Sequence, residues 1–199
     1  THIHIGAGIS LADLESLCAE ELPPLARMLR YFASRQIKHR ATVGGNLCTA
    51  SPIGDLAPAL VALSAEAVIA SRQGERRIPL EDFFVGYRQT ALQAGEILAG
   101  VVLPKIAAGQ RICTYKVSKR RELDISAVSA GMMVALDAAG NVADIRLVYG
   151  GMAATTKRAE ATEAALVGKP WTEDNVAAAA AHLSDCLLYT SPSPRDNRV

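Results

Sequence analysis

The hydrophobic pattern at the start of the chain predicts a strand and two helices. Residues 1–10, THIHIGAGIS, alternate apolar and polar side chains and end in glycines, which predicts a strand that leads into a turn. Ser10 is placed to cap a helix, and Pro23 and Pro24 mark the start of a second helix. Apolar residues follow helical spacing in both, at Leu11, Leu14, Leu17 and Cys18 and at Leu25, Met28, Leu29 and Phe32.

A further helix and three strands are predicted up to residue 106. Asp55 precedes the apolar run of residues 56–65, where its carboxylate can accept backbone N–H bonds as a helix cap. Residues 66–71 and 76–80 are predicted to be two strands joined by a turn around Gly74. Residues 96–104, EILAGVVLP, form another predicted strand that closes this unit.

The pattern changes after residue 106, where strands come first and helices follow. Three strand-like runs at residues 111–119, 127–136 and 142–151 precede two helical segments at 157–168 and 172–183, and Thr172 is placed to open the second helix. Runs of strands followed by helices are typical of a separate α+β unit. We therefore predict an α+β protein with a first subdomain over residues 1–106. A three-stranded antiparallel sheet with helices is expected over residues 107–184.

The two ends of the chain differ from the rest. Residues 185–199 include the run CLLYTSPSPRDNRV, which has no periodicity and resembles a translated sequencing-adapter read-through more than a protein terminus. The start lacks an initiator Met and the basic-then-apolar pattern of a signal peptide. We expect a soluble chain that is truncated at its front.

Charge and cysteine content narrow the class of protein. The 21 basic and 20 acidic residues leave a net charge of +1, which favours neither a nucleic acid nor a membrane as partner. The spacing of Cys18, Cys48, Cys113 and Cys186 matches no zinc knuckle or iron–sulfur loop. We therefore expect no metal site, reduced thiols with Cys48 and Cys113 packed in the core, and a cytoplasmic location.

The segment HRATVGGNLCTASPIGDLAPAL, residues 39–60, is the first candidate binding site. Gly44 and Gly45 allow positive φ and close approach of a ligand to the backbone, and hydroxyl and amide groups lie beside them at Thr42, Asn46, Thr49 and Ser51. Such groups suit a phosphate or a heterocycle. The alternative is a tight turn between two apolar segments. The pair does not open a helix as a G-x-G-x-x-G fingerprint would, and no P-loop motif is present.

The run YKVSKRRELDIS, residues 115–126, is the second polar cluster. Its charges fit a solvated strand end and turn. Lys116 differs from the other cations because it alternates with Tyr115 and Val117 along a strand. If its face turns toward the glycine segment, the ammonium could lie near a phosphate or an electron-rich ring. The scattered histidines and the absence of a Ser/His/Asp set disfavour a zinc or nucleophilic hydrolase.

Five separated motifs carry a family resemblance. The segment FASRQIKHRATVGGNLCTASPIGDLAPALVAL is followed in order by FFVGYRQT, EILAGVVLP, YKVSKRRELDIS and LVYGGMA. Together they resemble the FAD-binding subunit or domain of xanthine dehydrogenase, in the molybdenum hydroxylase family, from residue 1 to about residue 183. The resemblance implies a PCMH-type two-layer FAD-binding subdomain, then a C-terminal domain like that of the CO dehydrogenase flavoprotein.

The resemblance also implies a cofactor, partners and site residues. FAD would take electrons from a molybdopterin centre through two [2Fe-2S] clusters in partner domains or chains and pass them to NAD during oxidation of a purine such as xanthine or hypoxanthine. No side chain would act as a catalytic acid or base. Backbone N–H groups and a hydroxyl would hold the FAD diphosphate, and other residues would make polar or packing contacts. The implied cofactor-binding residues are Phe32, Thr42, Val43, Gly44, Gly45, Asn46, Thr49, Asp55, Leu98 and Lys116.

Two alternatives stay open at this point. One is the FAD-binding medium subunit of a carbon monoxide or aldehyde dehydrogenase, in which NAD need not be the acceptor. The other is a non-catalytic interaction module whose glycine segment is only a turn. The family's first FAD-binding subdomain, with its own glycine-rich diphosphate loop, has no counterpart in this chain, and neither do its iron–sulfur and molybdenum parts.

Overall fold

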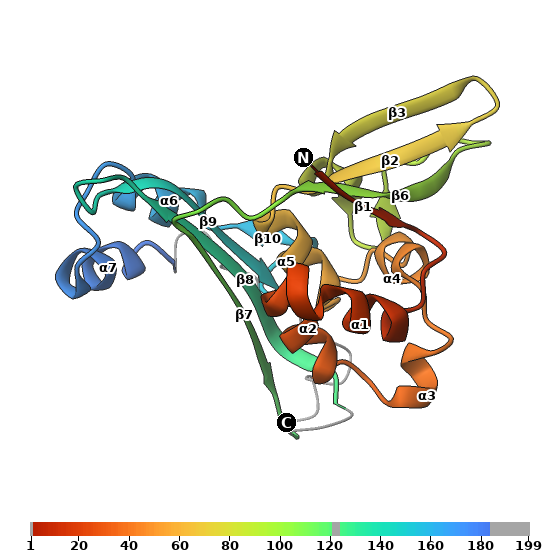
Figure 1. Cartoon of the computed structure of the whole chain (residues 1–199), viewed down its shortest axis with the longest axis horizontal. Coiled ribbons are helices and arrows are strands. Elements are labelled where there is room, and N and C mark those ends of the chain that lie inside the picture. The colour runs from red at the N-terminus through yellow and green to blue at the C-terminus, as the bar shows by residue number, and fades with distance from the viewer. Residues whose placement is uncertain (1, 121–123, 184–199) are drawn as a thin grey trace.

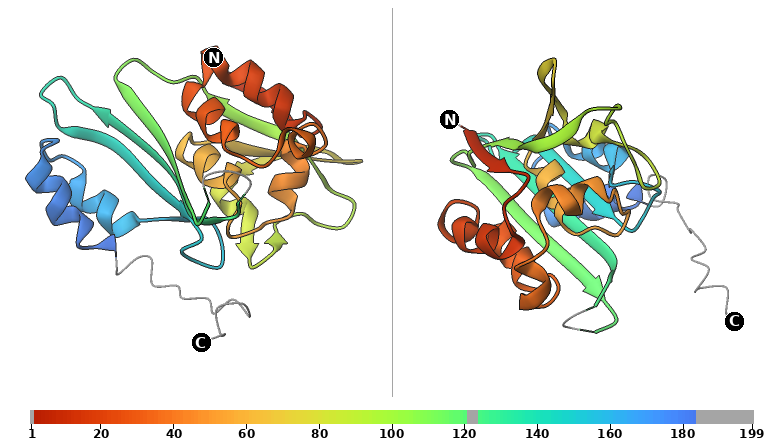
Figure 2. Two further views of the ribbon diagram at one scale, coloured as in Figure 1. Left: turned by 90° about the horizontal axis from the view of Figure 1, so that it is seen from below. Right: turned by 90° about the vertical axis from the view of Figure 1, so that its right-hand side faces the viewer.

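The first part of the protein is built on a four-stranded antiparallel sheet. The computed structural model describes residues 2–120 and 124–183. The sheet has the strand order β1-β6-β2-β3, formed by β1 (His2–Gly6), β6 (Ile97–Pro104), β2 (Glu66–Ser71) and β3 (Gly74–Pro79). Val101 of β6 lies between Ile5 and Ala67 in the register. The β2–β3 hairpin projects from the body of the molecule (Figures 1 and 2). The predicted strands are therefore confirmed.

Five helices accompany this sheet in the first part of the chain. They are α1 (Leu11–Glu21), α2 (Pro23–Arg30), α3 (Arg35–Lys38), α4 (Val43–Cys48) and α5 (Leu56–Ala62). The Ser10 side chain accepts a hydrogen bond from the Asp13 N–H, which confirms the predicted cap of α1. Leu11, Leu14 and Cys18 are buried, but Leu17 is 66% exposed. Helical spacing alone did not show how narrow the covered face of α1 is.

Short elements connect the first sheet to the second. A 3₁₀ turn, η1 (Leu80–Phe83), precedes the small two-stranded sheet of β4 (Phe84–Gly86) and β5 (Gln89–Thr90). Phe83 is fully buried, and its ring meets the ring of Phe84 edge to face at 5.5 Å.

The second sheet has four strands, which corrects the predicted three. Its order is β10-β9-β8-β7, formed by β10 (Lys157–Arg158), β9 (Val142–Gly150), β8 (Ser126–Leu136) and β7 (Gln110–Ser118). A strand of two residues is too short to show a period of two in the sequence. The Arg158 guanidinium donates to Glu163 at 2.7 Å and to Glu81 of η1 at 3.4 Å, so β10 is held by tertiary contacts.

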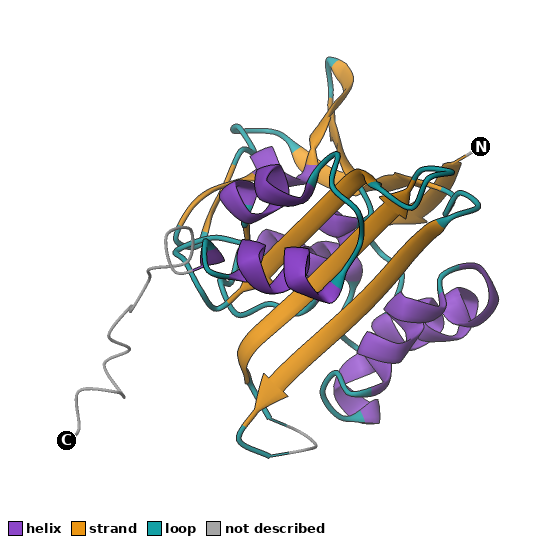
Figure 3. Cartoon of the chain, turned by 90° about the vertical axis from the view of Figure 1, so that its left-hand side faces the viewer, coloured by secondary structure: helices purple, strands orange, loops and turns teal. Residues whose placement is uncertain are grey.

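Helices cover both faces of the second sheet (Figure 3). On one face, α6 (Glu160–Leu166) and α7 (Glu173–Ala180) pack over a small core that includes Val142, Ile145 and Leu166. On the other face, Val148 joins the main core around α5. The Thr172 hydroxyl accepts from the Asn175 N–H and caps α7 as predicted.

The second sheet lies directly against α5. A Cβ atom added at Gly131 of β8 would come within 2.3 Å of the Pro58 carbonyl oxygen, and one at Gly150 of β9 within 3.0 Å of Pro58 Cγ. The Gly151 N–H donates to the Pro52 carbonyl at 2.6 Å. Glycines in the central strands thus let the two backbones touch, and main-chain contacts fix the junction between the sheets.

Two of the three cysteines that the structure describes are exposed. Cys18 is buried, but Cys48 and Cys113 are exposed, so their predicted place in the core is wrong. Apolar sequence neighbours did not reveal which face of its helix or strand each cysteine occupies.

Within residues 2–120 and 124–183, no helix has the length and apolar character needed to cross a membrane. Residues 185–199 lie outside the described residues.

Candidate functional site

The glycine pair lies in the first turn of a helix, which corrects the prediction that it does not open one. Thr42 has extended backbone angles, and its hydroxyl accepts a hydrogen bond from the Gly45 N–H at 3.0 Å. Helix α4 then runs from Val43 to Cys48, and Thr49 closes it by donating its hydroxyl to the Gly45 carbonyl at 2.8 Å. Neither Gly44 nor Gly45 has a positive φ, so neither glycine serves a left-handed turn.

Close packing against Ala7 explains why position 44 is a glycine. A Cβ atom there would lie 2.8 Å from the Ala7 Cβ and 3.1 Å from the Ala7 carbonyl oxygen, so a side chain would push α4 away from the segment that follows β1. The Gly44 N–H donates to this same Ala7 carbonyl at 2.8 Å, and the Val43 N–H donates to Ile9 at 3.2 Å. The N–H groups at the start of α4 are thus engaged within the chain. A ligand beside α4 would therefore be contacted mainly by side chains and not by these N–H groups.

A cleft of about 330 Å³ lies beside α4, between the first part of the protein and the second sheet. Phe32 and Asn46 line it from the first part, and Lys116 and Ser126 line it from strands β7 and β8. Its remaining lining residues are Ala33, Ser34, Ile37, Ser51, Ile53, Gly54, Asp55, Asp124 and Ile125. The cleft therefore combines an aromatic ring, an amide, hydroxyl groups and an ammonium group.

Two residues beside the cleft have strained backbone angles. Ala33, which lines the cleft, has φ 45°, and Ala50, which follows α4, has φ 44°. Left-handed angles in residues other than glycine cost free energy and persist where the surrounding structure imposes them. Both angles shape the chain segments that carry Phe32 and Ser51 into the cleft.

Asp55 is an ion-pair residue, which corrects its predicted role as a helix cap. It precedes α5, but its carboxylate makes no capping hydrogen bond. Instead, Oδ2 lies 2.8 Å from the Lys116 ammonium, and Oδ1 accepts a hydrogen bond from the Ser126 hydroxyl. The Asp55 side chain is 5% exposed and that of Lys116 is 13% exposed. The pair joins α5 to the second sheet within the protein.

Lys116 lies at a position shared by two clefts. Along β7, Tyr115 and Val117 are exposed, whereas the Lys116 side chain is largely buried and contacts Asp55, which precedes α5. This confirms that Lys116 occupies the opposite face of the strand from its two neighbours. It also lines a larger cleft of about 500 Å³, between α2 and β7, with Arg27, Tyr31 and Arg120.

The structure brings together four of the ten residues that the sequence singled out. Phe32, Asn46, Asp55 and Lys116 line one cleft. Thr42, Val43, Gly44, Gly45 and Thr49 form or flank α4 and do not line that cleft, and Val43 and Gly44 are buried. Leu98 is a buried residue of β6, opposite Ile69 in the first sheet. The assignment of these residues to a cofactor stays a prediction.

Sequence reasoning missed Ser126 as part of the site. It lies 71 positions from Asp55, at the start of β8, and is 4% exposed. A serine before an apolar strand is an ordinary strand-end residue, so no local signal marks it. The pairing of β7 with β8 places Ser126 opposite Ser118, two residues along β7 from Lys116, and from there its hydroxyl reaches Asp55.

The lining of the cleft fits part of an FAD molecule. Phe32 offers a ring face for a heterocycle, Asn46 offers an amide for hydrogen bonds, and the Lys116 ammonium, which is paired with Asp55 at 2.8 Å, offers its remaining N–H donors. FAD is larger than the drug-sized ligands that clefts of this volume enclose, so the cleft suits one portion of the cofactor. Across the part of the chain that the structure describes, no group of three His, Cys, Asp or Glu side chains could hold a metal ion.

The fold and the cleft define an α+β module in which two antiparallel sheets meet beside a cleft lined by an aromatic ring, an amide and a buried ion pair. Residues 1–106 match the family model of the FAD binding domain in molybdopterin dehydrogenase, and residues 113–194 match that of the CO dehydrogenase flavoprotein C-terminal domain. The chain therefore belongs to the family of FAD-binding domains of molybdopterin dehydrogenases.

Individual relatives agree with this family. A xanthine dehydrogenase of Emericella nidulans is 42% identical over 184 residues, 86% of this chain and 14% of that protein. A nicotinate hydroxylase of the same organism is 36% identical over 192 residues, 87% of this chain and 14% of that protein. The chain thus spans about one seventh of the length of these relatives.

A solved structure has the same fold. It is a carbon monoxide dehydrogenase from Hydrogenophaga pseudoflava that lacks the Mo-pyranopterin moiety of its molybdenum cofactor. It superposes with a TM-score of 0.85 at 31% identity and covers 91% of this chain and 63% of its own chain.

Proposed function

We propose that this chain binds FAD as the flavin domain of a molybdenum hydroxylase. The observation that carries the proposal is the meeting of Phe32, Asn46 and Lys116 in one cleft of a chain that belongs to this family. These side chains supply a stacking surface, an amide and the N–H donors of an ammonium that Asp55 holds in place, contacts that suit a flavin dinucleotide. Bound FAD supplies the redox chemistry, and the chain binds and orients it.

The proposed role within a larger enzyme is electron transfer. Electrons would reach this domain from a molybdopterin centre through [2Fe-2S] clusters in partner domains or chains, and would leave it for NAD. The proposed substrate is a purine such as xanthine or hypoxanthine, and the 42% identity to a xanthine dehydrogenase supports this choice. The proposed location is the cytoplasm, which the free thiols of Cys18, Cys48 and Cys113 support, and the near-zero net charge favours small-molecule partners.

A second candidate is the flavin subunit of a carbon monoxide or aldehyde dehydrogenase. The structural similarity to a carbon monoxide dehydrogenase, with a TM-score of 0.85, favours it. The two candidates differ in reductant and acceptor. Flavin bleaching with xanthine and recovery of the oxidised spectrum on addition of NAD would support the first. Bleaching with carbon monoxide or an aldehyde in place of xanthine would support the second.

Equilibrium dialysis against FAD tests the binding proposal. The intact protein should retain FAD, and the Lys116→Met variant should bind it about tenfold or more weakly, because a charge-assisted contact is lost. Lys105→Met is the matched control, since Lys105 is exposed and pairs with Glu21 at 3.0 Å, away from the cleft. Failure of the intact protein to retain FAD at saturating concentration would refute the proposal and leave the interaction module as the better account.

A further inference from the structure

Ser126 completes a polar contact that spans the two parts of the protein. The two oxygens of the Asp55 carboxylate have different partners, both from the second sheet. The Lys116 ammonium of β7 contacts Oδ2, and the Ser126 hydroxyl of β8 donates to Oδ1. All three residues line the cleft beside α4. The orientation of the carboxylate is therefore set from two neighbouring strands.

The Ser126 hydroxyl limits how the carboxylate can turn. Asp55 and Ser126 are 5% and 4% exposed, so water has little access to replace the hydroxyl if it is removed. A carboxylate with one donor can rotate about its terminal torsion, which has a broad energy profile. A second donor on the other oxygen restricts that rotation. Because the Lys116 ammonium contacts Oδ2, its position is restricted as well.

The position of the Lys116 ammonium depends on this restriction. Lysine carries its charge on a flexible four-carbon chain, and ordering such a chain when a ligand binds costs free energy. An ammonium already fixed by Asp55 avoids most of that cost.

We propose that Ser126 is a positioning residue for FAD: it holds the Asp55 carboxylate, which in turn holds the Lys116 ammonium at the wall of the cleft. This inference rests on the proposed FAD-binding function. Ser126 contacts Asp55 and acts on the cofactor only through Lys116. Its effect on FAD affinity must therefore depend on the presence of that lysine.

Strand β8 provides a matched control for Ser126. Ser129 is a second serine of the same strand and is 2% exposed. Its hydroxyl has no hydrogen-bond partner among the residues that the structure describes, and it does not line the cleft. Ser129 lies opposite Lys116 in the register of β7 with β8, so Ser129→Ala removes a buried hydroxyl beside the lysine without removing a hydrogen bond to Asp55.

The test measures the dissociation constant of FAD for the intact protein by fluorescence titration. Ser126→Ala should weaken binding about tenfold, since a hydrogen bond to a charged group is lost, while Ser126→Thr and Ser129→Ala should stay within about twofold of the unaltered protein. In a Lys116→Met background, Ser126→Ala should change the constant by less than about twofold, because sites that act through one group are not additive. Thermal melting of each apoprotein identifies any variant that is not folded.

The outcomes separate the two proposals. If the unaltered protein binds no FAD, the proposed function fails and this inference fails with it. If the unaltered protein binds FAD and Ser126→Ala binds it as tightly as Ser129→Ala, only the positioning role is overturned. An equal loss from Ser126→Ala with and without Lys116 would also overturn it, because the serine would then act independently of the lysine. Rescue by Ser126→Thr together with loss of the effect in Lys116→Met supports the role.

Discussion

The Lys116 ammonium lies 2.8 Å from the Asp55 carboxylate, although the two residues are 61 positions apart in the chain. Lys116 belongs to β7 of the second sheet, and Asp55 directly precedes α5 of the first part. Both side chains are largely buried. The contact therefore joins the two parts of the protein at the same point where they enclose the candidate cofactor cleft.

Removal of one member of this pair should destabilise the fold. We expect Asp55→Ala to lower the free energy of unfolding by about 3–5 kcal/mol, because it leaves a buried ammonium without its counter-ion. The double variant Asp55→Leu with Lys116→Met should recover much of that loss, since no charge is then left unpaired. Urea denaturation measures both. A loss of only about 1 kcal/mol in the single variant would match an ordinary helix cap and contradict the ion-pair role.

Gly44 should tolerate no side chain. We expect Gly44→Ala to lower the free energy of unfolding by about 1–3 kcal/mol, because the new Cβ would lie 2.8 Å from the Ala7 Cβ and overpack the contact between α4 and the segment after β1. Gly8→Ala is the control, since nothing lies within 4 Å of a Cβ atom there. Equal stability of the two variants in urea would show that the packing does not require glycine.

The junction of β8 with α5 predicts a still larger effect at Gly131. A Cβ atom there would meet backbone atoms of Pro58 and Ala59 at 2.3–2.8 Å, and backbone cannot move aside as a flexible side chain can. We expect Gly131→Ala to cost about 3 kcal/mol or more, at the upper end of the range for overpacking. Thermal and urea unfolding would measure the cost against Gly6→Ala, which has open space around its Cβ position. A loss no greater than that of Gly6→Ala would argue against direct contact of the two backbones.

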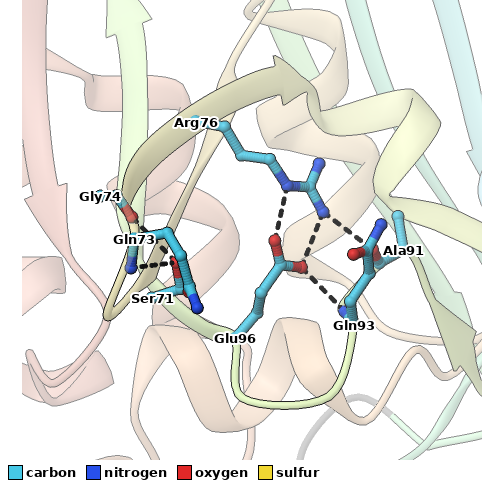
Figure 4. Close-up of polar contacts among 7 residues, drawn as sticks. All are labelled: Ser71, Gln73, Gly74, Arg76, Ala91, Gln93 and Glu96. Atoms are coloured by element: carbon cyan, nitrogen blue, oxygen red, sulfur yellow. Dashed lines mark hydrogen bonds and ion pairs between the residues drawn. The ribbon is translucent and has the colours of Figure 1, made fainter.

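The contact between Arg76 and Glu96 predicts an acid-dependent contribution to stability. The Arg76 guanidinium donates to both carboxylate oxygens of Glu96 at 2.8 Å, and the Gln93 N–H donates to one of them (Figure 4). The hydrogen bonds from Arg76, and then that from Gln93, lower the pKa of Glu96 from 4.5 to about 2. The folded state thus favours the ionised carboxylate, so this contribution is present above pH 4.5 and is lost as the pH falls toward 2.

Glu96→Gln tests this dependence. The stability difference between the unaltered protein and Glu96→Gln should be greatest near pH 6 and should shrink as the pH falls from 4.5 through about 2, below which the carboxyl is protonated in both states. Asp174→Asn is a matched control, because Asp174 is an exposed acid of α7 and lines none of the clefts described above. Urea midpoints measured across that pH range provide the comparison. A difference that stays constant with pH would show that the Arg76 contact does not favour the ionised form.

Local signals in the sequence determined most of the elements. Strand-like runs of residues predicted the long strands β6 to β9, and Ser10 and Thr172 predicted the starts of α1 and α7, because strand propensity and capping depend on neighbours within a few residues. The family motifs, which are also local, led to the expectation of FAD. Elements without a local signal, such as the two-residue strand β10, were not predicted.

Only the tertiary structure decided how the candidate site is put together. The sequence suggested Asp55 as a cap and Gly44 as a flexible ligand loop, because each assignment suits the residues on either side. The fold instead gives Asp55 two partners from strands more than sixty positions away and packs Gly44 against Ala7. Ser126 joins the site from the start of β8, opposite Ser118 of β7, where its hydroxyl reaches Asp55. The hydrogen-bond donors to a carboxylate are set by the tertiary fold. A sequence pattern that spans a few residues does not indicate which distant strand supplies them.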